Sequence, residues 1–176
     1  MKIYFIRHAE TQANLDASKP TTLTAKGEEQ VKKLAEYLKD ESFDAIYSSD
    51  LERAQKTAQA ISEDIIITDE LREMFRVIIG GPKKESRPNR KQEDEQRAEQ
   101  FFQKILAWNY NKVAIVAHGN IIRYFLARIQ NKDVKTMWEE EIIPCSINII
   151  EHNKITYVTK HLKGIETKET NFVEWK

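Results

Sequence analysis

Cysteine is almost absent from this sequence. Its 176 residues include a single cysteine, Cys145. One cysteine cannot form a disulfide within the chain, and Cys145 has no cysteine or histidine neighbour at the short spacing typical of a structural zinc site. A disulfide scaffold and a zinc module of that kind are therefore excluded, and a reducing compartment is favoured.

An excess of charge and long apolar runs are also missing. The 28 Lys and Arg residues balance 28 Asp and Glu residues, so no overall charge attracts the chain to nucleic acid or to an anionic membrane. No apolar stretch approaches the length of a membrane span. The apolar run over residues 1–6 is too short for a signal peptide and has no small-residue cleavage site after it. We expect a cytoplasmic protein that binds neither nucleic acid nor membrane, in which any selectivity for anions is local.

Segments typical of strands and helices alternate along the chain, which has the length of one ordinary domain. Periodicity predicts strands near residues 2–6, 44–47, 65–68, 112–117, 146–150 and 155–159. It predicts helices over 24–38, 51–62, 92–108 and 121–129, with Thr24 as one N-cap and residues 48–50 as another. This order predicts a single three-layer α/β domain over 1–176, with a mostly parallel central sheet flanked by helices.

One segment, residues 74–91, has no clean periodicity. A Gly80-Gly81-Pro82 breaker is followed by a run of basic side chains, namely Lys83, Lys84, Arg87, Arg90 and Lys91. Breakers and clustered charge are typical of an exposed loop. We expect a short basic lid inserted over the edge of the sheet.

Polar side chains follow several of the predicted strands. Arg7 and His8 end the first strand, Arg53 lies in the first helical turn after the second, and His118 with Gly119 ends the fourth. Each alone also fits a surface arginine or a core histidine. Because the carboxyl ends of parallel strands meet at one edge of a sheet, we expect them to converge. Guanidinium groups and a helix start bind phosphate, and a neutral imidazole is a nucleophile.

Together these motifs resemble the histidine phosphatase superfamily, the phosphoglycerate mutase-like proteins. The matching blocks, in family order, are residues 7–11 with Asn14, 23–27, 48–54, 71–73 and 118–120. Five blocks in order are far more specific than one. The last two look most like the protein serine/threonine phosphatase branch related to phosphoglycerate mutase.

The resemblance implies a phosphomonoester hydrolase that needs neither a metal nor a cofactor. It implies that His8 attacks phosphorus and becomes a phosphohistidine. It also implies that Arg7 and Arg53 neutralise the phosphoryl oxygens in place of Mg²⁺ and that His118 donates a further hydrogen bond to them. The implied substrate is a phosphorylated small molecule or a phosphoprotein, and a homodimer is compatible with the sequence.

Three further positions complete the implied site. Asn14 and Gly119 contribute to binding the substrate, and Glu73 protonates the leaving oxygen before it activates water. The chain departs from the family where Ala9 replaces the usual glycine after the nucleophile. The short lid argues against a phosphoglycerate mutase-type phosphotransferase, which needs a closed site. A catalytically weak phosphoprotein-binding module is a second alternative, although the nucleophile and the acid are both present.

Overall fold

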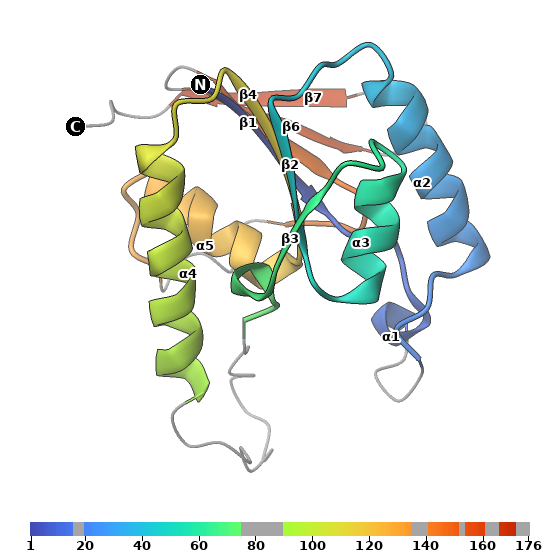
Figure 1. The fold of residues 1–176 in the computed structure, drawn as a ribbon, viewed down its shortest axis with the longest axis horizontal. Coiled ribbons are helices and arrows are strands. Elements are labelled where there is room, and N and C mark those ends of the chain that lie inside the picture. The colour runs from blue at the N-terminus through green and yellow to red at the C-terminus, as the bar shows by residue number, and fades with distance from the viewer. Residues whose placement is uncertain (16–19, 75–89, 135–140, 152–153, 161–165, 172–176) are drawn as a thin grey trace.

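The computed structural model describes residues 1–15, 20–74, 90–134, 141–151, 154–160 and 166–171. The elements follow one another as β1 (Lys2–Arg7), α1 (Gln12–Leu15), α2 (Ala25–Leu38), β2 (Ala45–Ser49), α3 (Glu52–Gln59), β3 (Ile66–Thr68), the short 3-10 helix η1 (Asp69–Leu71), α4 (Arg90–Ala107), β4 (Lys112–Ala117), α5 (Gly119–Ile129), β5 (Ile147–Glu151), β6 (Lys154–Lys160) and β7 (Glu166–Asn171) (Figure 1). Within these ranges no helix is both long and apolar enough to cross a membrane.

All seven strands belong to one sheet, in the order β3-β2-β4-β1-β5-β6-β7. The four strands β3, β2, β4 and β1 are parallel, and β5, β6 and β7 extend the sheet with antiparallel pairs. The predicted α/β fold is confirmed, and β7 is a strand that the sequence analysis did not anticipate. In the register of the central pair Arg7 lies opposite Ala117, which brings the residues after the two strands, His8 and His118, to the same edge.

Helices cover both faces of the sheet. Figure 1 shows α2 and α3 on one side and α4 and α5 on the other. Alternate residues of β1 serve the two faces, because successive side chains of a strand point in opposite directions. Ile3 and Phe5 belong to the apolar cluster under α4 and α5, whereas Tyr4 and Ile6 belong to the cluster under α2 and α3. The expected three layers are therefore present.

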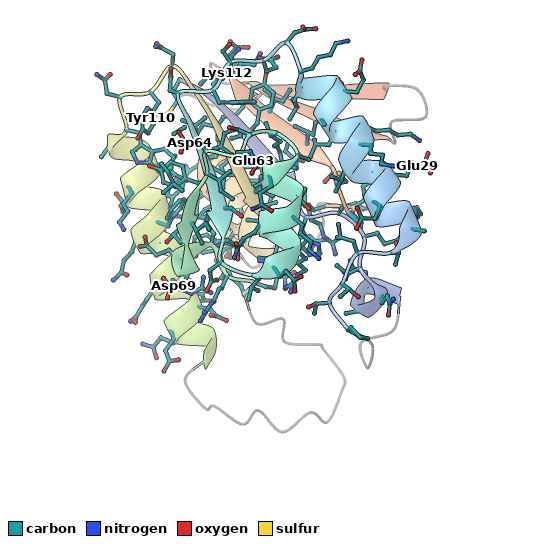
Figure 2. All side chains as sticks on the ribbon, turned by 45° about the vertical axis from the view of Figure 1, so that its right-hand side comes forward. Glu29, Glu63, Asp64, Asp69, Tyr110 and Lys112 are labelled. Carbon is teal, nitrogen blue, oxygen red and sulfur yellow. The ribbon has the colours of Figure 1, made fainter. Side chains whose placement is uncertain are left out.

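The amino ends and the carboxyl ends of the parallel strands form opposite edges of the sheet. Figure 2 shows Lys112, where β4 begins, and Asp69, directly after β3, at opposite ends of the sheet. The predicted functional residues all follow strands, so they lie at the carboxyl end, where Asp69 is found.

Most predicted boundaries agree with the structure to within a few residues. Thr24 is the N-cap of α2, and its hydroxyl accepts the amide hydrogen of Gly27 at 2.9 Å. The cap predicted at residues 48–50 is wrong. Ser48 and Ser49 are the last residues of β2, where they pair with Ile67 and Thr68 of β3, and the N-cap of α3 is at residue 51. Of the expected lid, residues 75–89 lie outside the described part of the chain.

Candidate active site

The structure brings two imidazole rings together at the carboxyl edge of the sheet. His8 follows β1 and His118 follows the neighbouring β4, and their ring centroids are 5.1 Å apart. The amide of His8 donates to the carbonyl of Ala117 at 2.9 Å, which extends the pairing of the two strands by one residue. The proximity of the rings is thus a direct result of the register of the parallel pair.

His8 is buried, with 3% of its surface exposed. Its Nδ1 lies 2.8 Å from the carbonyl oxygen of Ala9. A carbonyl only accepts hydrogen bonds, so Nδ1 carries the ring proton and Nε2 presents a lone pair. Burial lowers the pKa of His8 to about 3, and the charges of Arg53 and Arg7 act in the same direction. His8 is therefore a neutral imidazole at pH 7, the form that attacks phosphorus.

Two guanidinium groups lie beside these rings. Arg7 donates from Nη1 to the carbonyl of Ile142 at 2.5 Å, while its buried Nε has no partner among the described residues. Burial lowers the pKa of both Arg7 and Arg53, and the carboxylate of Glu73 opposes this effect. An arginine stays protonated in spite of such burial. A buried guanidinium group with an unpaired N–H is suited to bind an anion by donating a hydrogen bond to it.

Gly119 allows the first turn of α5 to approach Arg7. A Cβ atom at this position would lie 3.2 Å from Nη1 of Arg123 and 3.6 Å from Cζ of Arg7. Gly119 thus lies between two guanidinium groups, and its contact with substrate stays a prediction. Arg123 is a neighbour of the site that the sequence analysis missed, although its helical spacing from Gly119 places both residues on one face of α5.

His118 is fully buried at the N-cap of α5. Its Nε2 lies 2.9 Å from the hydroxyl of Ser49, and its Nδ1 has no partner among the described residues. Burial lowers the pKa of His118 well below its ordinary value, with further contributions from His8, Arg53 and Arg7. Both imidazoles are therefore neutral at pH 7.

Glu73 reaches the same edge from the segment after η1. One of its carboxylate oxygens, Oε1, accepts the amide hydrogens of Met74 and Asn120 at 3.0 Å and of Ile121 at 3.3 Å. Burial raises the pKa of Glu73, although these hydrogen bonds and Arg7 oppose the shift. The described residues give Oε2 no hydrogen bond, so this oxygen is available for proton transfer. A raised pKa is what a carboxyl acid needs near neutral pH.

The segment that carries Glu73 is held from two sides. Arg72 forms a bidentate ion pair with Asp50, in which Nε donates to Oδ1 at 2.9 Å and Nη2 donates to Oδ2 at 2.5 Å. Arg97 of α4 donates to the carbonyl oxygens of Glu70 and Arg72 at 2.7 and 2.9 Å. These contacts hold η1 and Arg72, the residue directly before Glu73, and they pair the side chain of Arg72 with Asp50 instead of Glu73.

The loop after His8 is held by its neighbours. The amide of Ala9 donates to Oγ1 of Thr57 at 3.1 Å, and this hydroxyl donates to the carbonyl of Arg53 at 2.8 Å. The methyl group of Ala9 is fully buried among apolar side chains under α2 and α3, so it is accommodated where the family has glycine. Thr57 therefore links the loop after His8 to α3, a role that the sequence analysis did not assign.

Asn14 is an exposed residue of α1, the short helix that follows this loop. Its Oδ1 accepts from the amide and the hydroxyl of Thr11 at 2.9 and 3.0 Å. This oxygen therefore stabilises the loop, and a contact between Asn14 and substrate stays a prediction. Within the described ranges, no three His, Cys, Asp or Glu side chains gather as a metal site requires; metal independence also stays a prediction.

The fold and the paired imidazoles define a phosphatase of the histidine type, and comparison with known proteins agrees. The model of the histidine phosphatase superfamily (branch 1) matches residues 3–163. The chain belongs to this superfamily, and it is a phosphomonoester hydrolase of that class.

Three bacterial phosphatases are among the similar proteins. The adenosylcobalamin/alpha-ribazole phosphatase of Escherichia coli (strain K12) is 31% identical over 172 residues, which cover 78% of this chain and 83% of the relative. The uncharacterized phosphatase PhoE of Bacillus subtilis (strain 168) is 29% identical and covers 84% and 86% of the two chains. The crystal structure of the alpha-ribazole phosphatase from Shigella flexneri superposes with a TM-score of 0.73 at 29% identity, over 87% of this chain and 91% of the other. The finer likeness to the serine/threonine phosphatase branch stays a prediction.

Proposed function

We propose that this protein hydrolyses phosphorylated small molecules through a phosphohistidine formed on Nε2 of His8. The observation that carries the proposal is the state of His8. Its ring is buried and neutral, its Nδ1 proton is held by Ala9, and its Nε2 lone pair lies beside two guanidinium groups. Relatives whose names specify alpha-ribazole phosphatases support a small substrate, and a phosphoprotein substrate is the alternative that the assay below separates.

In the first step Nε2 of His8 forms a bond to phosphorus while the bond to the leaving oxygen breaks. Arg7 and Arg53 balance the charge of the non-bridging oxygens. His118 donates a hydrogen bond from its unpaired Nδ1. The proton that the leaving oxygen needs comes from Oε2 of Glu73, whose pKa is raised by burial.

The second step returns the enzyme to its first state. Glu73, now a carboxylate, accepts a proton from water, and the oxygen of that water attacks phosphorus as the bond to His8 breaks. Inorganic phosphate leaves, and Glu73 is protonated again. The two guanidinium groups supply the charge compensation that a divalent metal supplies elsewhere, so no step requires a metal ion.

The test is to trap the phosphoenzyme. Wild-type protein is mixed with a ³²P-labelled monoester, quenched, and divided between acid and base; we expect label that survives base and is lost in acid. His8→Ala is the control and should hold no label. Label that survives acid, as on a hydroxyl residue, would remove His8 from its role.

Substrate class is tested by comparing kcat/KM over two panels, one of small phosphomonoesters and one of phosphopeptides. We expect the small molecules to give the larger values. Higher values for phosphopeptides would overturn that half of the proposal while leaving the phosphohistidine untouched. A mutase would return an isomeric phosphate ester in place of inorganic phosphate.

A cytoplasmic location and a homodimer stay predictions of the sequence.

A further inference from the structure

The hydroxyl group of Ser49 lies between the ring of His118 and a backbone amide. Ser49 is fully buried at the end of β2, next to β4 in the sheet. Its Oγ lies 2.9 Å from Nε2 of His118 and accepts the amide hydrogen of Leu51 at 3.3 Å. The other ring nitrogen of His118, Nδ1, is buried without a partner among the described residues.

A neutral imidazole carries one proton, so two arrangements are possible. If Nε2 of His118 held the proton, Ser49 would accept twice and its own hydrogen would have no acceptor among the described residues. Nδ1 would then be a buried lone pair, which cannot donate a hydrogen bond to a phosphoryl oxygen. If Nε2 is bare, Ser49 accepts from Leu51 and donates to the ring, and both of its hydrogen bonds are made.

In the second arrangement the proton of His118 is on Nδ1. This leaves one unpaired N–H in a buried position, which costs free energy until an acceptor arrives. A phosphoryl oxygen is such an acceptor, whereas a lone pair on Nδ1 would repel it. Only the second arrangement satisfies the hydroxyl and also makes the ring a donor to an anion.

We propose that Ser49 is a positioning residue that holds His118 as the Nδ1–H tautomer, so that this imidazole donates to the phosphoryl group. The proposal rests on the proposed function, because the acceptor it assigns is the phosphate of the substrate. His8 and His118 are then the same tautomer, but one ring attacks phosphorus and the other donates a hydrogen bond to the phosphoryl group. Ala9 binds the Nδ1 proton of His8 and leaves Nε2 as the nucleophile, while Ser49 occupies Nε2 of His118 and leaves Nδ1–H as a donor.

The experiment reads the tautomer directly, in the absence of substrate. Protein labelled with ¹⁵N-histidine is examined by long-range ¹H–¹⁵N correlation, which distinguishes the protonated ring nitrogen from the bare one. The signal of His118 is assigned with His118→Gln, since the chain has four histidines. We expect a protonated Nδ1 in the wild type. A protonated Nε2 would overturn the proposal without any variant, and this readout does not depend on whether the phosphohistidine is formed.

Three substitutions then test whether Ser49 is the cause. Ser49→Ala should release His118 to the Nε2–H form and weaken inhibition by vanadate roughly 10- to 100-fold, the usual value of a hydrogen bond to a charged group. Ser49→Thr keeps the hydroxyl and should restore both. Ser48→Ala is the matched control for the tautomer, because Ser48 is equally buried on the same strand and donates to a backbone carbonyl instead.

Each outcome decides the question. An unchanged tautomer in folded Ser49→Ala overturns the proposal, as does a Ser48→Ala variant that changes it equally. If Ser49→Ala fails to fold, Ser49→Cys takes its place in the same comparison, because a thiol is only a weak hydrogen-bond donor. A shifted tautomer with unchanged vanadate inhibition would show that His118 does not donate to the phosphoryl group, and it would overturn the second half of the proposal.

Discussion

Replacing Glu73 by Gln removes the proposed proton donor and changes little else. Oε1 of Glu73 accepts three backbone N–H groups, from Met74, Asn120 and Ile121. A glutamine places its amide oxygen in the same position and keeps those hydrogen bonds. The other oxygen becomes an NH₂ group, which cannot transfer a proton to a leaving group. The fold and the phosphate-binding groups should therefore survive the substitution.

The expected loss of rate depends on the leaving group. General acid catalysis contributes roughly 10²- to 10⁴-fold, and a hundredfold loss corresponds to about 2.7 kcal/mol of activation free energy. Alkyl phosphates leave as strongly basic alkoxides, so Glu73→Gln should lose at least about 100-fold in kcat/KM with them. With p-nitrophenyl phosphate, whose leaving group barely needs a proton, the loss should be far smaller.

Stability supplies an independent check on the same variant. The folded-state pKa of Glu73 is raised, so the carboxyl group favours folding at low pH and this contribution is lost as pH rises through that pKa. The glutamine side chain does not titrate in this range. The Glu73→Gln variant should therefore be at least as stable as the wild type at pH 8, measured by urea unfolding.

The matched control is Glu70→Gln. Glu70 belongs to the neighbouring η1, and its carboxylate pairs with Lys104 at 2.6 Å. Its substitution should leave the ratio of alkyl to aryl rates unchanged. Equal losses on both substrates in Glu73→Gln, in a variant that remains folded, would refute the assignment of Glu73 as the acid.

Three further predictions concern a glycine of α2, the titration of His8 and the need for a metal ion. Gly27→Ala should destabilise the protein by about 1–3 kcal/mol, because its Cβ would lie 2.2 Å from the carbonyl oxygen of Glu10; an unchanged urea midpoint would contradict the contact. The pKa of His8 falls from 6.5 to about 3 on folding, so the unfolded chain binds a proton at His8 before the folded protein does. The free energy of unfolding should therefore fall by about 2 kcal/mol between pH 7 and pH 5. The free energy of unfolding of His8→Asn should depend less on pH over the same range. EDTA should leave kcat unchanged while vanadate inhibits; activity that returns only on addition of Mg²⁺ or Zn²⁺ would contradict the role of Arg7 and Arg53.

The position of the site could be predicted because it follows from local pattern. A run of apolar residues that ends in Arg7 and His8 marks the end of a buried strand, and the same pattern ends at His118. The alternation of strands and helices makes those strands parallel, and parallel strands end at one edge. No contact between distant side chains is needed for this inference.

The supporting contacts could not be predicted, because they depend on tertiary geometry. Ser49 and Thr57 are ordinary residues of a strand end and a helix, and nothing in the sequence shows which polar atom each hydroxyl meets. Cys145 is a further case. It adopts a φ of 61°, and its amide donates to the carbonyl oxygens of both Arg7 and His8 at 3.1 Å. A cysteine in the left-handed region has no signature in the sequence, since glycine is the residue expected there.

The charges of the site explain why a neutral His8 can accept a phosphoryl group. The charge of Glu73 acts on the guanidinium groups of Arg7 and Arg53, and Arg123 is a third guanidinium group beside Arg7. The three guanidinium groups carry two net positive charges with Glu73 ionised and three with Glu73 protonated, so in either state they can balance the two negative charges of a monoester dianion. As Nε2 bonds to phosphorus, the ring of His8 gains positive charge, and its Nδ1–H bond to the carbonyl 2.8 Å away becomes charge-assisted and stronger. The backbone acceptor thus stabilises the phosphohistidine more than the free imidazole, and it does so without a carboxylate that would cancel the positive charge needed to hold the phosphate.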